Sequence, residues 1–180
     1  MKIIGFVYKD EKVKGERPWE MVLKGDSCLL NGRKPFFTPD RSNEIGATEC
    51  CILRVSRLGK EISLKFADRY YDAIAPGVDF VALDKLREAQ ETGNAWTTAI
   101  AFDYSLAIGE WIEKEESSKL KDESYLLSPE QAIVEASKVM TIRQGDLIYI
   151  QVKRAPRIVQ KEEIIRTVID GEEKLYCKIK

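Results

Sequence analysis

The sequence predicts an α+β fold that is made mostly of β-strands. Three observations lead to this prediction. The chain has 180 residues, short β-like segments recur along it, and only two segments carry strong helix signals. A content of 44% hydrophobic and 33% charged residues is typical of a globular protein with a real core. We therefore expect one domain that spans residues 1–180.

The N-terminal third of the chain indicates three short strand regions. The β-branched run in Met1–Tyr8 predicts a buried first strand, and Trp19–Lys24 predicts a second one. The Asn31-Gly32 pair is a tight-turn signal. We expect it to join Cys28–Leu30 and Lys34–Phe37 as a small hairpin or as a turn between short strands.

The next segments lead toward a predicted helix. Cys50–Val55 predicts a strand that ends at the turn Leu58–Lys60. Ile62–Phe66 either pairs back on that strand or leads into a helix over Ala67–Ile74. The following Ala75-Pro76-Gly77 segment has the composition of a turn.

Two helices are indicated by their end signals. Asp84–Thr92 contains good helix formers and is followed by Gly93, which favours a left-handed cap. The run Ser128–Gln131 combines an N-cap serine, a first-turn proline and a capping-box glutamine. Strands are predicted to follow at Leu147–Val152, Ile164–Ile169 and Lys174–Ile179, the last two joined by an Asp170-Gly171 hairpin turn.

Composition excludes several classes of function. The net charge is −1 with basic residues scattered along the chain, so we expect no nucleic-acid partner. No apolar run approaches the length of a membrane span or a signal peptide, so we expect no membrane partner and a cytoplasmic location. The four cysteines should then be reduced thiols.

The chain contains no histidine, which restricts its chemistry. Serine and cysteine nucleophile schemes that use an imidazole base are excluded. Any acid or base step must use a carboxylate, lysine, tyrosine or thiol of shifted pKa. The glycines are isolated, so a phosphate-binding loop is also excluded.

Several motifs, in their order and spacing, resemble the fumarylacetoacetate hydrolase family, in particular its single-domain bacterial members. They lie mainly between Arg57 and Glu110, and weaker echoes extend over nearly the whole chain. The matching pieces are Leu53-Arg54-Val55, Arg57-Leu58-Gly59-Lys60, Phe66-Ala67, Arg69-Tyr70-Tyr71-Asp72, Gly77-Val78-Asp79-Phe80, Gly93-Asn94, Trp96, Phe102-Asp103 and Ile108-Gly109-Glu110.

This resemblance implies a fold, an assembly and a cofactor. The fold is a layered, curled β-sheet roll with peripheral helices, like the C-terminal domain of the family, and the assembly is a homodimer. Family members hold Mg²⁺ or Ca²⁺ with two glutamates of an E-x-E strand and an aspartate before a phenylalanine, which are the hard oxygen ligands such ions prefer. The resemblance also implies acylpyruvate-like diketo or enol acids as substrates, with the metal stabilising an enolate.

The resemblance can be followed residue by residue. The E-x-E strand corresponds to Thr48, Glu49 and Cys50, so both ligand positions are neutral and the one glutamate points to the opposite face. Asp79 matches the third ligand, as a vestigial metal residue. The remaining positions are Leu83 where a basic residue often stands, Ile100 where a lysine is usual, and Asp103 in the Phe-Asp pair.

Each of these residues also has a structural interpretation. Asp79 could hydrogen-bond its own loop backbone after the turn-like Ala75-Pro76-Gly77 segment. Cys50 could be a small hydrophobe on a buried strand, and Asp103 could cap a turn before Tyr104. Trp96 is expected in the core or at a dimer interface.

We therefore predict a divergent fumarylacetoacetate hydrolase-like protein. The loss of carboxylate ligands, and Ile100 in place of a cation, argue against metal-dependent C–C hydrolysis. The protein would act as a binding or assembly domain, with a homodimer and a small carboxylate ligand as its expected partners and with no cofactor. The alternative is an active hydrolase, isomerase or decarboxylase with a rebuilt site that binds Mg²⁺ or Ca²⁺ and uses Asp79, Glu49, Asp103 or a nearby lysine.

Overall fold

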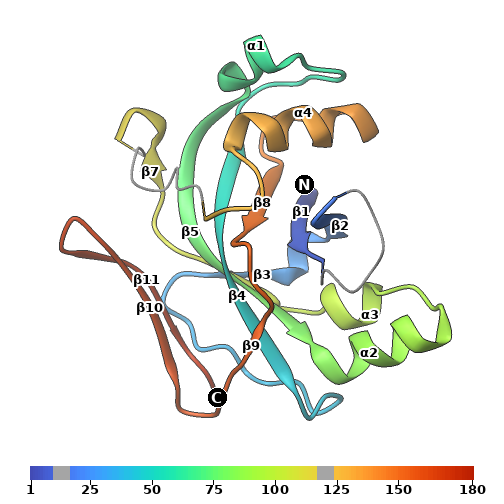
Figure 1. Cartoon of the computed structure of the whole chain (residues 1–180). Helices are drawn as coiled ribbons and strands as arrows, with labels where there is room; N and C mark the ends of the chain where they lie inside the picture. The colour runs from blue at the N-terminus through green and yellow to red at the C-terminus, as the bar shows by residue number, and fades with distance from the viewer. Residues whose placement is uncertain (10–16, 117–123) are drawn as a thin grey trace.

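A computed structural model describes residues 1–9, 17–116 and 124–180. Most elements are strands (Figure 1). The strands are β1 Ile3–Tyr8, β2 Trp19–Lys24, β3 Leu29–Asn31, β4 Ile45–Val55, β5 Tyr71–Ala82, β6 Leu106–Ile108, β7 Ile112–Glu113, β8 Leu147–Gln151, β9 Arg157–Ile158, β10 Ile164–Ile169 and β11 Glu172–Lys178. The helices are α1 Leu64–Ala67, α2 Leu83–Thr92, α3 Thr97–Ile100 and α4 Pro129–Val139, with 3₁₀ turns at Asp26–Cys28 and Asp68–Tyr70. The predicted α+β class, mostly β, is confirmed.

One mixed sheet organises the molecule. Its strand order in the described ranges is β2-β1-β8-β4-β5-β6-β3, with β7 added to β5 and β9 added to β4. The long strands β4 and β5 pair antiparallel from Ile45 with Ala82 to Val55 with Tyr71 and form its axis. The hairpin β10-β11 forms a separate two-stranded sheet, which projects at the lower left of Figure 1.

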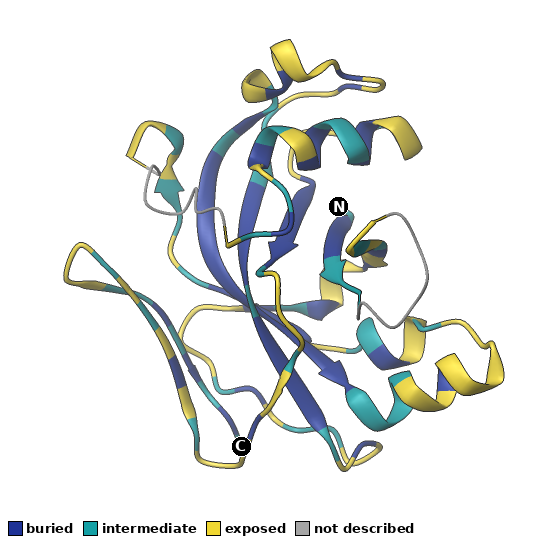
Figure 2. Cartoon of the chain, viewed as in Figure 1, coloured by how far each residue is buried: buried dark blue, intermediate teal, exposed yellow. Residues whose placement is uncertain are grey.

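Hydrophobic side chains alternate between the two faces of this sheet because neighbouring residues of a strand point in opposite directions. Phe6, Leu53 and Ile148 belong to a core that also contains Ile133 and Ala136 of α4. Ile3, Cys50, Ile52 and Tyr149 belong to a second core on the opposite face. The central strands are dark blue in Figure 2, which marks them as buried. Any polar side chain in the middle of either face is therefore removed from water.

Most of the predicted elements are confirmed. The first two strands, the strand after Gly145 and the C-terminal hairpin form as expected. Helix α2 ends at Gly93, whose φ of 71° is left-handed. Helix α4 begins with a complete capping box, in which Ser128 Oγ accepts from Gln131 N and Gln131 Oε1 accepts from Ser128 N. Across the described ranges, none of the helices is long and apolar enough to span a membrane.

The helix predicted over Ala67–Ile74 is wrong. Only its first residues are helical, in α1 and the following 3₁₀ turn, and the chain enters β5 at Tyr71. Ala73 and Ile74 pair with Arg54 and Leu53 of β4. Alanine favours helices, but pairing and burial in a central strand outweigh that local preference.

The Ala75-Pro76-Gly77 segment is not a turn, because it continues through β5. Pro76, which has no N–H to donate, lies between the residues of β5 that pair with β7 and those that pair with β6. The predicted turn at Asn31-Gly32 does occur, with Gly32 at φ 72°. Its flanking segments do not form a hairpin, since β3 pairs parallel with β6 and Phe36 bridges to Ile179.

Candidate functional site

Asp79 lies inside β5, toward its C-terminal end, and is the centre of a buried polar cluster. Its side chain is 5% exposed. Oδ1 lies 2.6 Å from Lys24 Nζ, and Oδ2 accepts a hydrogen bond of 2.7 Å from Gln151 Nε2. Asp79 is thus held by side chains of two other strands. The interpretation that it hydrogen-bonds its own loop is wrong, because this position is inside a strand.

Lys24, at the end of β2, is a central residue of the cluster that the sequence analysis missed, as it also missed Gln151. Its side chain is fully buried, whereas the preceding Leu23 is 49% exposed. The ammonium donates to the carbonyl oxygen of Ser105 at 3.0 Å and to Ser105 Oγ at 2.9 Å. Strand alternation places Lys24 on the same face as the buried Val22, and this is the signal that could have revealed it.

Gln151 connects the cluster to the end of the neighbouring strand β1. While its Nε2 donates to Asp79, its Oε1 accepts from the backbone N–H of Tyr8 at 2.8 Å. Both ends of the amide are therefore used, which fixes the side chain at the end of β8. Buried amides with complete hydrogen bonding of this kind hold neighbouring groups in one arrangement.

Thr48 and Cys50 of β4 lie beside Asp79. Thr48 pairs with Asp79 and Cys50 with Gly77, so the two side chains share one face of the sheet. Burial, with the negative charge of Asp79 adding to it, raises the pKa of the Cys50 thiol well above its usual value. The same two causes raise the pKa of the Tyr149 phenol. Both groups therefore carry their protons at neutral pH and provide neither a nucleophile nor a base.

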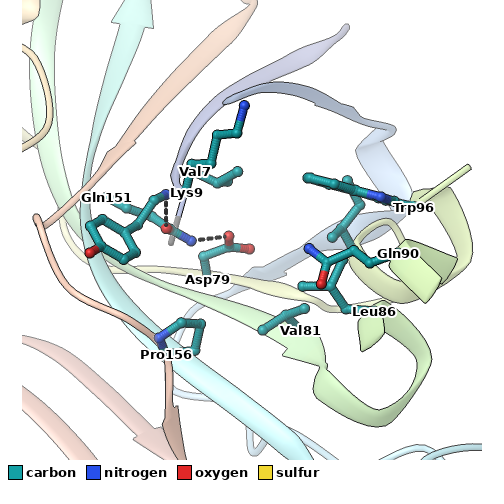
Figure 3. Close-up of a pocket in the computed structure, with 11 residues that line it drawn as sticks. Val7, Lys9, Asp79, Val81, Leu86, Gln90, Trp96, Gln151 and Pro156 are labelled. Atoms are coloured by element: carbon teal, nitrogen blue, oxygen red, sulfur yellow. Dashed lines mark hydrogen bonds between the residues drawn. The ribbon is translucent and has the colours of Figure 1, made fainter. Parts of the chain in front are cut away.

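A pocket of about 280 Å³ opens in front of Asp79 (Figure 3). Asp79 and Gln151 lie on one side, and Trp96 and Gln90 lie on the opposite side, on and next to helices α2 and α3. Most of the remaining wall is apolar. The other lining residues are Val7, Tyr8, Lys9, Val81, Leu86, Ile100 and Pro156. Trp96, which was expected in the core or at an interface, is a half-buried wall of this pocket.

The structure brings together some of the other predicted site residues and separates the rest. Ile100 lines the pocket at the end of α3, and its carbonyl accepts from Ser105 Oγ at 3.1 Å. Glu49 points to the other face of β4, where it pairs with Arg154. Asp103 is exposed on the turn before Tyr104. Leu83 begins α2 and packs closely against Gly46.

No family model and no curated protein sequence matches the chain. Solved structures do match over its whole length. A Yersinia pestis protein provisionally assigned to the fumarylacetoacetate hydrolase family has a TM-score of 0.84 at 16% identity, over 99% of this chain and 92% of that one. The chain therefore has the fold of the fumarylacetoacetate hydrolase family, at low sequence identity, as its motifs predicted.

Two further matches are structures of named enzymes. Fumarylpyruvate hydrolase from Pseudomonas aeruginosa, in complex with Mn²⁺ and pyruvate, has a TM-score of 0.77 at 16% identity, over 99% of this chain and 88% of that one. The 5-carboxymethyl-2-hydroxymuconate delta-isomerase from Mycobacterium smegmatis has a TM-score of 0.78 at 17% identity, over 99% of this chain and 78% of that one. The neighbours of this fold thus include hydrolases and isomerases.

The residues of this chain do not fit a divalent metal ion at Asp79. Thr48 and Cys50 are uncharged, whereas a Mg²⁺ or Ca²⁺ site needs several oxygens and usually more than one carboxylate. The ammonium of Lys24 already lies 2.6 Å from Oδ1 and would repel a second cation. Within the described ranges, no group of three or more His, Cys, Asp or Glu residues could hold a metal ion.

Proposed function

We propose that this chain is a divergent member of the fumarylacetoacetate hydrolase family that binds a small organic ligand and does not carry out metal-dependent C–C hydrolysis. The observation that carries this proposal is the set of side chains around Asp79 that could serve as metal ligands. One carboxylate stands there without a charged oxygen partner, and its charge is balanced by a lysine. A Lewis acid bound at this point would lack the ligands that hold it.

The chemistry around the pocket also supports a binding function. Cys50 and Tyr149 stay protonated because of their raised pKa values. Asp79 is held in an ion pair and a hydrogen bond, so it is poorly placed to take a proton from a ligand. General acid–base catalysis needs a group that is free to exchange a proton with the ligand, and both oxygens of Asp79 already face other side chains.

The pocket walls indicate the kind of ligand. Trp96, Leu86 and Ile100 offer an apolar surface, and Gln90 offers an amide that can donate and accept. Lys9 lines the same pocket and its ion pair with Glu20 is long, at 3.9 Å. We infer a small carboxylate with an apolar body, whose carboxylate meets Lys9. Small-molecule sites usually combine apolar walls with a few placed polar groups in this way.

A direct test measures metal binding and turnover on the same preparation. Mg²⁺, Mn²⁺ and Ca²⁺ are titrated by calorimetry, and acylpyruvate hydrolysis and oxaloacetate decarboxylation are then assayed with each ion. We expect neither sub-millimolar binding nor turnover. Turnover that needs the metal and disappears in Asp79→Ala would refute the proposal and establish the active alternative.

Ligand binding is tested by the fluorescence of Trp96. Small carboxylates of graded apolar size are titrated into the wild type and into Trp96→Phe, with Trp111→Phe as the matched control because Trp111 does not line the pocket. We expect a saturable change that Trp96→Phe abolishes and Trp111→Phe retains, and that Lys9→Met weakens. A response that is identical in all variants would contradict binding in this pocket.

The alternative, an active enzyme with a rebuilt site, would have to work with Asp79 and the nearby Lys24, because Glu49 and Asp103 lie apart from them. Glu49 is paired with Arg154 on the opposite face of β4, and Asp103 is exposed on a turn.

Assembly is a separate proposal, since the expectation of a homodimer rests on the family resemblance. Light scattering at several protein concentrations would measure the mass directly, and a monomer at all concentrations would contradict it.

A further inference from the structure

The Lys24 and Asp79 pair is an unusual feature for the interior of a protein. The two side chains are 0% and 5% exposed, and they come from strands β2 and β5, which are not neighbours in the sheet. Removing two charges from water is costly, and a single pairwise attraction often fails to compensate for it. Such a pair needs additional polar partners to be tolerated, and both ions have them.

Three oxygen atoms surround the ammonium within 3.0 Å. Ser105 supplies its carbonyl oxygen and its Oγ, and Asp79 supplies Oδ1. The contact with Oδ1 is electrostatic and lacks the geometry of a regular hydrogen bond. Asp79 Oδ2 is satisfied by Gln151. The ammonium therefore lies in a shell of oxygens, which is also the kind of environment that a hard metal ion prefers.

The charge balance at this point is complete without a metal. The cluster holds one carboxylate and one ammonium, and Thr48 and Cys50 beside them are neutral. The similar fumarylpyruvate hydrolase was solved in complex with Mn²⁺, so a protein of this fold can hold a metal cation. A lysine that reaches in from β2 can supply a positive charge to Asp79 as part of the chain itself.

We propose that the ammonium of Lys24 takes the place of a divalent cation in this protein. The ammonium neutralises Asp79 and holds β2, β5 and the turn at Ser105 together. This inference rests on the proposed function, because it assumes that the wild-type site takes no metal. The inference adds that Lys24 itself, and not only the missing ligands, prevents a metal ion from binding at Asp79. It follows that shortening Lys24 should re-create a weak cation site from the oxygens that it leaves.

The experiment compares thermal unfolding of Lys24→Ala with and without millimolar Mn²⁺. The variant leaves Asp79 buried without its cation, and we expect its Tm to fall by roughly 10 °C or more. Mn²⁺ should recover part of that loss in Lys24→Ala, and should leave the wild type and Lys24→Ala/Asp79→Asn unchanged. Lys85→Ala is the matched control, because Lys85 pairs with Glu88 on the surface, and it should show neither effect.

The outcomes separate the two proposals. A wild type that is itself stabilised by Mn²⁺ and shows metal-dependent turnover would refute the proposed function. An inert wild type together with a Lys24→Ala variant that Mn²⁺ does not stabilise would refute only the role of Lys24. If Lys24→Ala does not fold, Lys24→Met and Lys24→Met/Asp79→Asn decide the question by urea unfolding. The double variant must then be the more stable of the two, and an equal or lower midpoint would overturn the inference.

Discussion

Gly5 lies directly opposite Tyr149 in the parallel pairing of β1 with β8, and the ring of Tyr149 covers the α-carbon of Gly5. A β-carbon at Gly5 would lie 2.1 Å from Tyr149 Cζ, far inside van der Waals contact. The fully buried tyrosine, which stands next to the Lys24 and Asp79 cluster, therefore depends on the absence of a side chain at Gly5.

We expect Gly5→Ala to destabilise the protein by about 1–3 kcal/mol, because the ring of Tyr149 must move within a filled core. Urea unfolding measures this change. Gly25→Ala is the matched control, since a β-carbon there would meet nothing within 4 Å, and it should change the stability by no more than about 0.5 kcal/mol. Equal midpoints for the two variants would contradict the close packing of Tyr149 on Gly5.

The cysteines should be unreactive in the folded protein. All four are free and buried, and burial raises the pKa of Cys51 to about 12 and that of Cys177 to about 11. Thiolates, not thiols, react with aromatic disulfide reagents. At pH 8 we expect slow labelling of the native protein and complete labelling of all four after denaturation in guanidinium chloride. A thiol that reacts within seconds in the native protein would show that one of these environments is more open.

Asp146 should make the stability depend on acid pH. Burial alone would raise its pKa, but hydrogen bonds from Lys2 and from the backbone N–H of Arg143, at 2.8 Å, outweigh burial and hold the pKa below its usual value. A carboxyl group of this kind contributes stability above its unfolded pKa and loses that contribution as the pH falls through its folded pKa.

Asp146→Asn should therefore cost about 1–3 kcal/mol at neutral pH, because charged hydrogen bonds are lost. The difference from the wild type should shrink steadily as the pH falls from about 4, near the unfolded pKa, through the lower folded pKa, because the wild-type carboxylate then becomes protonated too. Urea unfolding at a series of pH values measures this, with the exposed Asp40→Asn as control. A difference that does not vary with pH would argue against the ionic role of Asp146.

The capping box of α4 should contribute measurably to stability. Ser128→Ala removes the acceptor for Gln131 N, a hydrogen bond of 3.2 Å, and should cost about 1 kcal/mol. Helix α4 packs Ile133 and Ala136 into the core, so its loosening will appear in global unfolding. The Ser128→Ala and Gln131→Ala changes should be less than additive, since each breaks the same reciprocal pair. Strict additivity in a double-mutant cycle would count against a coupled capping box.

Elements with local signals could be predicted from the sequence. The proline and capping box at Ser128, the left-handed Gly93 and the Asp170-Gly171 turn act over a few residues, and each marks its element where the structure has it. Strand β5 could not be predicted, because its alanines and its proline argue locally for a helix and a turn. Only its pairing with β4 makes an extended conformation favourable there.

The candidate site also has features that the sequence predicts and features that only the structure reveals. The sequence by itself determined that histidine chemistry is impossible, that the family-like ligand positions hold Thr48 and Cys50, and that Asp79 is the remaining carboxylate. Only the tertiary structure decided what that carboxylate does, because its cation comes from Lys24, 55 positions away (79 minus 24), on a strand that is not its neighbour. The attraction between buried charges depends on distance in space, and separation along the chain does not reveal it.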